Sequence, residues 1–120
     1  MKSSLIPTVY LAGPMRGLPD ANYPAFDAAR DRLTSLGWEV ISPADLDRQA
    51  GVQPDAEGNI SNSLLREAMS RDLPKLCMAD AIYLMPGWRQ SEGAFAEYNL
   101  ASVLHVRVMH SEETDGAIAP

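Results

Sequence analysis

The stretch Thr8-Val9-Tyr10-Leu11-Ala12-Gly13-Pro14 decides the fold that the sequence predicts. Its first five residues are aliphatic, aromatic or β-branched, which is typical of a short buried strand. The Gly-Pro pair that follows is typical of a turn. Residues 8–12 are therefore expected to form a strand that ends in a loop.

Outward from this strand, apolar runs and helical spacing alternate along the chain. Further strands are predicted at 38–41, 81–85 and 106–109, and helices at 23–36, 44–48, 62–76 and 93–104. Repeated strand–helix alternation is typical of a parallel sheet with helices on both faces. We therefore expect an α/β three-layer sandwich with a mainly parallel sheet of about four to five strands.

The bulk composition limits the organisation and the partners of the protein. Its 120 residues suit one domain, expected at 1–110, and the small, acidic residues 111–120 are expected to form a flexible tail. The net charge of −6 argues against binding to a nucleic acid polymer, but it leaves room for one nucleotide. The lone Cys77 follows Leu76 in a helical pattern and is expected to be buried.

Other classes of protein lack support in the sequence. It contains no apolar run of membrane length and no recognisable signal peptide, so we expect a cytoplasmic protein with no membrane partner. No cluster of His, Cys and Asp has the spacing of metal ligands, so no metal and no cofactor are predicted.

The most informative single residue is Glu97. On a helix over 93–104, it lies about 40° from Gly93 and about 40° from Ala101 on the helical wheel. A carboxylate in this apolar stripe faces the sheet, where it needs hydrogen-bond partners or a raised pKa. The pattern fits a catalytic acid and equally a structural acid bonded to a buried donor.

Asp72 presents the same pattern on the preceding helix. It lies about 60° from Met69, inside a stripe that also includes Leu65 and Leu76. The alternative is an exposed position on the flank of that stripe. Two acids on the inner faces of different helices favour a pair that carries out glycosidic chemistry.

The predicted helix at 93–104 is preceded by Ser91, a residue that commonly caps helices. The same geometry suits an anion, because free N–H groups and the helix dipole point outward there, and Gly93 lets a ligand approach the backbone. Arg16 follows the first strand and could bind a phosphate through two hydrogen bonds. The alternatives are a cap alone and a solvated surface arginine.

Two aromatic residues have less specific patterns. Tyr10 belongs to the first strand, where it suits the core, although its hydroxyl could orient Glu97. Trp88 lies in a loop expected at the carboxyl edge of the sheet, where ligands of such folds bind. Its ring could stack on a base or pack over a helix.

Four segments occur in this order along the chain: Tyr10-Leu11-Ala12-Gly13-Pro14-Met15-Arg16-Gly17, Arg71-Asp72-Leu73, Ala79-Asp80-Ala81-Ile82 and Ser91-x-Gly93-x-x-x-Glu97-x-x-x-Ala101. Together they resemble the nucleoside 2-deoxyribosyltransferase family and the related 2′-deoxynucleoside 5′-monophosphate N-glycosidases. The resemblance covers residues 9–108, most of the chain.

This resemblance implies a flavodoxin-like (Rossmann-type) fold in a homodimer or larger oligomer. It also implies a retaining mechanism in which Glu97 attacks the sugar, Asp72 helps the base to depart and Tyr10 orients the glutamate. The residues that the resemblance implies for substrate and phosphate binding are Gly13, Met15, Arg16, Gly17, Ser91 and Gly93, with Trp88 as a possible contact of the base.

Within the resemblance, Ser91-x-Gly93 and Arg16-Gly17 match the monophosphate hydrolases. Transferases of free nucleosides instead have an Asp at the position that matches Ser91. We therefore expect an N-glycosidase of (deoxy)nucleoside 5′-monophosphates that forms a covalent glycosyl-Glu97 intermediate. The alternatives are a nucleoside 2-deoxyribosyltransferase and a non-catalytic nucleotide-binding module. The preferred base, the sugar and the oligomeric state stay open.

Overall fold

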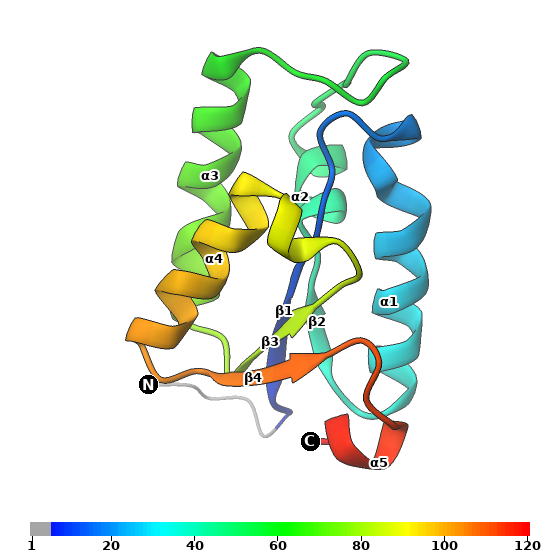
Figure 1. The fold of residues 1–120 in the computed structure, drawn as a ribbon, viewed down its shortest axis with the longest axis vertical. Helices are drawn as coiled ribbons and strands as arrows, with labels where there is room; N and C mark the ends of the chain where they lie inside the picture. The colour runs from blue at the N-terminus through cyan, green and yellow to red at the C-terminus, as the bar shows by residue number, and fades with distance from the viewer. Residues whose placement is uncertain (1–5) are drawn as a thin grey trace.

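The computed structural model describes residues 6–120 and has a single parallel sheet flanked by helices (Figure 1). The strands follow the order β2-β1-β3-β4, and every neighbouring pair is parallel. This is the strand order of flavodoxin-like folds, so the predicted fold class is confirmed. The elements are β1 (Thr8–Ala12), η1 (Pro19–Asn22), α1 (Tyr23–Ser35), β2 (Glu39–Ile41), α2 (Pro43–Gln49), α3 (Asn62–Cys77), β3 (Ala81–Leu84), η2 (Trp88–Gln90), α4 (Glu92–Val103), β4 (Arg107–His110) and α5 (Asp115–Ile118).

Helices cover both faces of the sheet because successive side chains of each strand point to opposite faces. On β1, Val9 and Leu11 belong to a core cluster that also contains residues of α1 and α5. Tyr10 and Ala12 belong to a second cluster that contains residues of α3 and α4. Figure 1 shows the two layers, with α1 on one side of the strands and α3 and α4 on the other.

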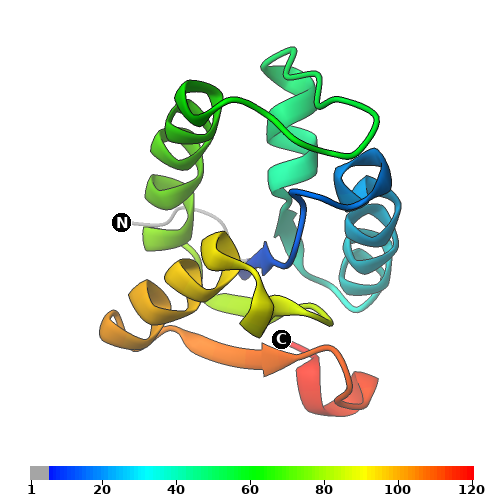
Figure 2. The ribbon, with the colours of Figure 1, turned by 45° about the horizontal axis from the view of Figure 1, so that its top comes forward.

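All four strands end at the same edge of the sheet, because all of them run parallel. The loops after β1 and β3 and the segment between α2 and α3 therefore lie at one end of the molecule (Figure 2). Residues on these loops can form a common site although they are far apart in the sequence.

The predicted boundaries lie within one residue of the observed ones, and the last strand shows a local reason for such a shift. Val106, expected to begin the last strand, donates its N–H to Ala101 O at 3.0 Å and so closes the end of α4. The strand therefore begins at Arg107. Asn22, which precedes α1, makes no side-chain cap and instead donates to Pro14 O at 2.9 Å, holding the loop after β1.

The prediction of a flexible tail at 111–120 is wrong, because this segment folds back onto the sheet. Thr114 caps the short α5, Ile118 is fully buried, and Ile118 O accepts a hydrogen bond from Trp38 Nε1 at 2.7 Å. Arg32 donates to the carbonyl oxygens of Ser111 at 3.0 Å and Glu113 at 2.7 Å. These contacts connect distant parts of the chain, so the local composition of the tail did not reveal them.

The prediction of a buried Cys77 is also wrong, because the thiol is exposed. The buried stripe of α3 runs through Ala68, Asp72 and Leu76, and the next residue lies about 100° away from that stripe. Within residues 6–120, no helix combines the length and the apolar character needed to cross a membrane.

Shortening Ile118 tests the packing of the tail. We expect Ile118→Ala to lower the free energy of unfolding by about 2–5 kcal/mol, because it leaves a cavity in the core under α1. Urea unfolding measures this change. The control is Val103→Ala at a side chain that is 74% exposed, for which a change within about 0.5 kcal/mol is expected. Equal stability of wild type and Ile118→Ala would contradict the packed tail.

Candidate active site

A cavity of about 1000 Å³ opens at the carboxyl edge of the sheet. Its walls come from the loop after β1, from α2, from the segment between α2 and α3, from α3, and from the loop after β3 with the first turns of α4. This volume lies at the upper end of the range of about 300–1,000 Å³ that is usual for ligand sites. The cavity therefore has room for a mononucleotide.

Glu97 lines this cavity and is otherwise buried, with 6% of its surface exposed. It shares the inner face of α4 with Ala94 and Ala101, as the helical spacing predicts. The hydroxyl of Tyr10, from the central strand β1, donates a hydrogen bond to Glu97 Oε2. Burial raises the pKa of Glu97 to about 8, while the bond from Tyr10 opposes the shift and the nearby Asp72 adds to it.

Asp72 lines the same cavity from α3, with 4% of its surface exposed. The alternative of an exposed flank is therefore wrong. Its Oδ1 atom is buried and has no hydrogen-bond partner among the described residues. Burial raises the pKa of Asp72 to about 7, with a further rise from the charge of Asp47 and a smaller opposing effect of Arg71.

The charge of Asp72 contributes to the raised pKa of Glu97, so the two carboxyl groups interact. Between the pKa values of about 7 and about 8 they hold about one proton together, and the higher pKa places it more often on Glu97. The hydroxyl of Tyr10 stabilises a charge on Glu97, whereas no donor among the described residues stabilises a charge on Asp72 Oδ1. The site can therefore present one ionised carboxylate and one neutral acid to a ligand, a combination suited to covalent acid–base chemistry.

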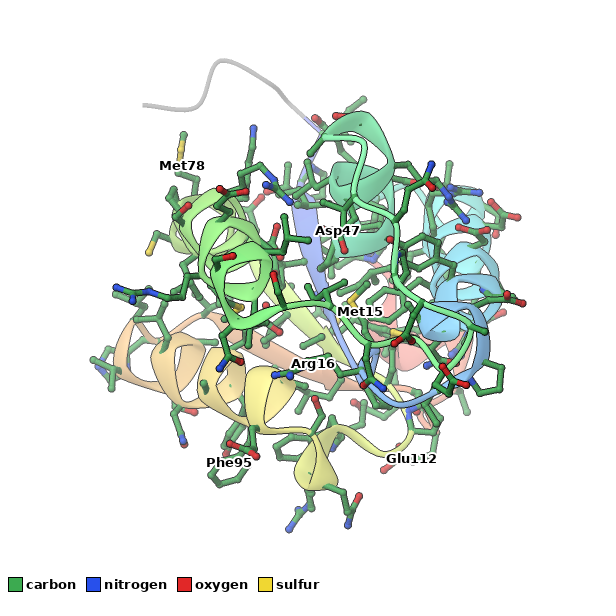
Figure 3. All side chains as sticks on the ribbon, turned by 90° about the horizontal axis from the view of Figure 1, so that it is seen from above. Met15, Arg16, Asp47, Met78, Phe95 and Glu112 are labelled. Atoms are coloured by element: carbon green, nitrogen blue, oxygen red, sulfur yellow. The ribbon has the colours of Figure 1, made fainter. Side chains whose placement is uncertain are left out.

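The cavity lining also offers groups that suit an anion. Ser91 caps the 12-residue helix α4 by accepting a hydrogen bond from Ala94 N at 3.2 Å. The first turn of this helix lines the cavity, and a helix N-terminus suits an anion. Arg16 lines the cavity from the loop after β1 and has no hydrogen-bond or ion-pair partner among residues 6–120. Figure 3 shows it between α3, α4 and the loop. The exposed Glu92 opposes an anion here, and the guanidinium of Arg16 offsets it.

The other residues predicted for phosphate binding have separate roles. A Cβ atom on Gly13 would lie 2.8 Å from Met85 Cβ, so close packing explains this glycine without a ligand. A Cβ atom on Gly93 would meet nothing within 4 Å, so packing does not explain that glycine, and its open face lines the cavity. Gly17 lines the cavity with φ +81°, and the half-buried Met15 contributes apolar lining.

Trp88 does not line the cavity, so the structure gives no support to the predicted contact with a base. Its ring is 9% exposed and packs against the ring of Tyr98, with centroids 4.7 Å apart. The guanidinium of Arg89 covers it at 5.0 Å from the centroid. These contacts explain the tryptophan as packing over α4, the alternative that the sequence left open.

Sequence reasoning missed Asp47 on α2, a third buried carboxylate at the cavity. Asp47 Oδ1 accepts from Arg71 Nη2 at 3.1 Å, and Oδ2 accepts from the hydroxyl of Tyr23 at 3.4 Å. The residue three positions earlier, Ala44, is fully buried. Because residues i and i+3 share a face of a helix, the apolar Ala44 was the feature that could have revealed Asp47.

Across residues 6–120, no group of three or more His, Cys, Asp or Glu side chains is arranged to hold a metal ion. The structure contains one chain, so the homodimer and the nucleotide partner stay predictions.

Comparison with known proteins identifies the family to which the chain belongs. None of the curated proteins matches it. A family model described as "Domain of unknown function (DUF4406)" matches residues 7–110. That description names no activity, so the resemblance to nucleoside 2-deoxyribosyltransferases stays a prediction. Because the match spans the whole sheet and every wall of the cavity, the chain belongs to the DUF4406 family.

Proposed function

We propose that this protein hydrolyses the N-glycosidic bond of (deoxy)nucleoside 5′-monophosphates. The observation that carries the proposal is the pair of buried carboxyl groups, Glu97 and Asp72, that line one cavity from two helices. Their raised pKa values suit a nucleophile and an acid that work near neutral pH.

The reaction proceeds in two balanced steps. Ionised Glu97 attacks the anomeric carbon of the sugar, the bond from this carbon to the base nitrogen breaks, and Asp72 gives its proton to the departing base. The sugar phosphate is then held as an ester of Glu97. Water attacks the anomeric carbon, Asp72 takes a proton from this water, and Glu97 leaves as a carboxylate. The products are the free base and a (deoxy)ribose 5-phosphate.

Other residues of the cavity lining support a phosphorylated substrate. The guanidinium of Arg16, which has no partner among residues 6–120, can form charged hydrogen bonds to a 5′-phosphate. The N-terminus of α4, capped by Ser91, adds backbone N–H groups and the positive end of a helix dipole. The open face of Gly93 lets a phosphate approach this backbone. The phosphate would thereby hold the sugar in a fixed position relative to Glu97.

A second candidate, a nucleoside 2-deoxyribosyltransferase, is favoured by the charge of the cavity. Four acids, Asp47, Asp72, Glu92 and Glu97, face a single arginine in the described lining. Such a balance suits a neutral nucleoside better than a phosphate dianion. In this case the ester of Glu97 would be resolved by a second base instead of water, and base exchange would be observed.

Removing the charge of the nucleophile tests the mechanism. We expect Glu97→Gln to lower the rate of base release by about three orders of magnitude or more, since the amide cannot form the ester. Chromatography of the free base from a panel of mononucleotides and nucleosides measures the rate. The matched control is Glu67→Gln, an exposed residue of α3 outside the cavity, which should keep wild-type activity. If Glu97→Gln released base at the wild-type rate, Glu97 would not be the nucleophile. Binding of nucleotides by calorimetry without turnover in the wild type would indicate a non-catalytic module.

Removing the guanidinium distinguishes the two candidate substrates. We expect Arg16→Ala to lower kcat/KM for nucleoside monophosphates by about 10- to 150-fold, because a charged hydrogen bond contributes about 1.5–3 kcal/mol. The kcat/KM for free nucleosides should stay unchanged. Arg66→Ala, at an exposed arginine of α3 outside the cavity, is the control. Equal losses for both substrates, or no loss for either, would contradict phosphate binding by Arg16.

The paired carboxyls predict a narrow bell-shaped dependence of kcat/KM on pH. The productive form has Glu97 ionised and Asp72 protonated, so activity falls at acidic pH when Glu97 gains a proton and at alkaline pH when Asp72 loses its proton. Because the pKa of Glu97 is the higher of the two, this form is a minor fraction of the protein, and its population still peaks between the two pKa values. With pKa values of about 7 and about 8 for the pair, we expect the maximum between these two pH values. Base release between about pH 5.5 and about pH 9 measures the profile. A flat profile over this range would be incompatible with the pair.

A further inference from the structure

Asp47 is the one buried carboxylate of the described cavity lining that the proposed reaction does not use. Only 6% of its surface is exposed, although an isolated buried charge is costly. Arg71 and the hydroxyl of Tyr23 offset this cost through the bonds at 3.1 Å and 3.4 Å. Figure 3 shows Asp47 on α2, in the part of the view between α3 and α1, and Asp47 lines the cavity.

Asp47 acts on Asp72 through charge. Arg71 directly precedes Asp72 in the sequence, and its guanidinium would favour the ionised form of Asp72. The ion pair with Asp47 neutralises this guanidinium and places a second negative charge near Asp72. Both effects raise the pKa of Asp72, and they act in the same direction as its burial. By contrast, Asp47 is not among the groups that shift the pKa of Glu97.

Among the causes that shift the pKa of Asp72, Asp47 is the one charged group of the described residues that raises it. The neutral Tyr10 contacts Glu97 and not Asp72, and the buried Oδ1 of Asp72 has no partner among the described residues. The titratable and charged groups that surround Asp72 come from several elements: Asp47 from α2, Tyr23 from α1, Arg71 from α3, Glu97 from α4, Tyr10 from β1 and Arg16 from the loop after β1.

We infer that Asp47 is a positioning residue that, through its ion pair with Arg71, keeps a proton on Asp72 so that Asp72 can serve as the acid of the site. The catalytic consequence rests on the proposed function, whereas the effect of Asp47 on Asp72 is a property of the folded protein alone. The alternative is a purely structural connection between α2 and α3.

Titration of the side-chain carbons in aspartate-labelled protein tests the inference without any substrate. Asp72→Asn identifies the resonance of Asp72. We expect Asp47→Asn to move the titration midpoint of Asp72 to lower pH by about 1 unit, since a like charge is lost and Arg71 is left unpaired. Asp45→Asn is the matched control, because Asp45 lies on the same helix and pairs with Arg30 and Arg48 away from the cavity. It should leave the midpoint unchanged.

Base release provides the second readout. Under acidic conditions Asp72 is protonated in wild type and in Asp47→Asn, so their activities should match. At neutral and alkaline pH the variant should lose about tenfold, as expected for a fall of one unit in the pKa of the acid. Asp47→Glu, which keeps the charge, should restore the wild-type profile.

The outcomes separate the inference from the proposed function. A uniform loss at every pH, or an unchanged midpoint of Asp72 in Asp47→Asn, would overturn the role of Asp47. If Asp47→Asn does not fold, Asp47→Ser takes its place with the same expected shift of the Asp72 midpoint. A wild-type midpoint of Asp72 near the ordinary value of about 4 would also overturn the inference. A wild type that releases no base contradicts the proposed function, while the shift of the Asp72 midpoint still supports the role of Asp47.

Discussion

The hydroxyl of Tyr10, on the central strand, donates a hydrogen bond to a carboxyl group on α4, and the site depends on this contact. Without a donor, Glu97 would be a buried charge with no partner, a costly arrangement in an apolar core. The bond also connects the rigid middle of the sheet to the helix above it. The position of the carboxylate is therefore set by the most regular part of the fold, and the loops shape only the remaining walls of the cavity.

Burial has opposite consequences for the stability and for the chemistry of this region. Water would stabilise the charged forms of the acids at the cavity, whereas an apolar interior favours their neutral forms. The same desolvation moves the pKa values of Glu97 and Asp72 into the range where one can be charged while the other holds a proton. A fold selected for stability alone would place apolar side chains at both positions. Their presence on inner helix faces is the physical argument for a function.

Charges of both signs line the cavity. Three buried carboxyl groups line the cavity from α2, α3 and α4, and the same cavity is lined by Arg16, which has no partner among residues 6–120, and by the capped N-terminus of α4. Asp47 and Arg71 form a charge pair and act on Asp72 without a direct bond to it.

The sequence by itself determined the layered α/β architecture, the inward direction of Glu97 and the cap at Ser91, because these follow from periodicity and local hydrogen bonding. It suggested that Tyr10 contacts Glu97, a bond that the structure contains, and it left open whether Asp72 faces inward. Only the tertiary structure decided which other groups meet. It brought Asp47 next to Arg71, and it folded residues 111–120 onto Trp38. It also turned Trp88 away from the cavity. Such contacts join residues far apart in the chain, and local patterns carry no information on the distance between them.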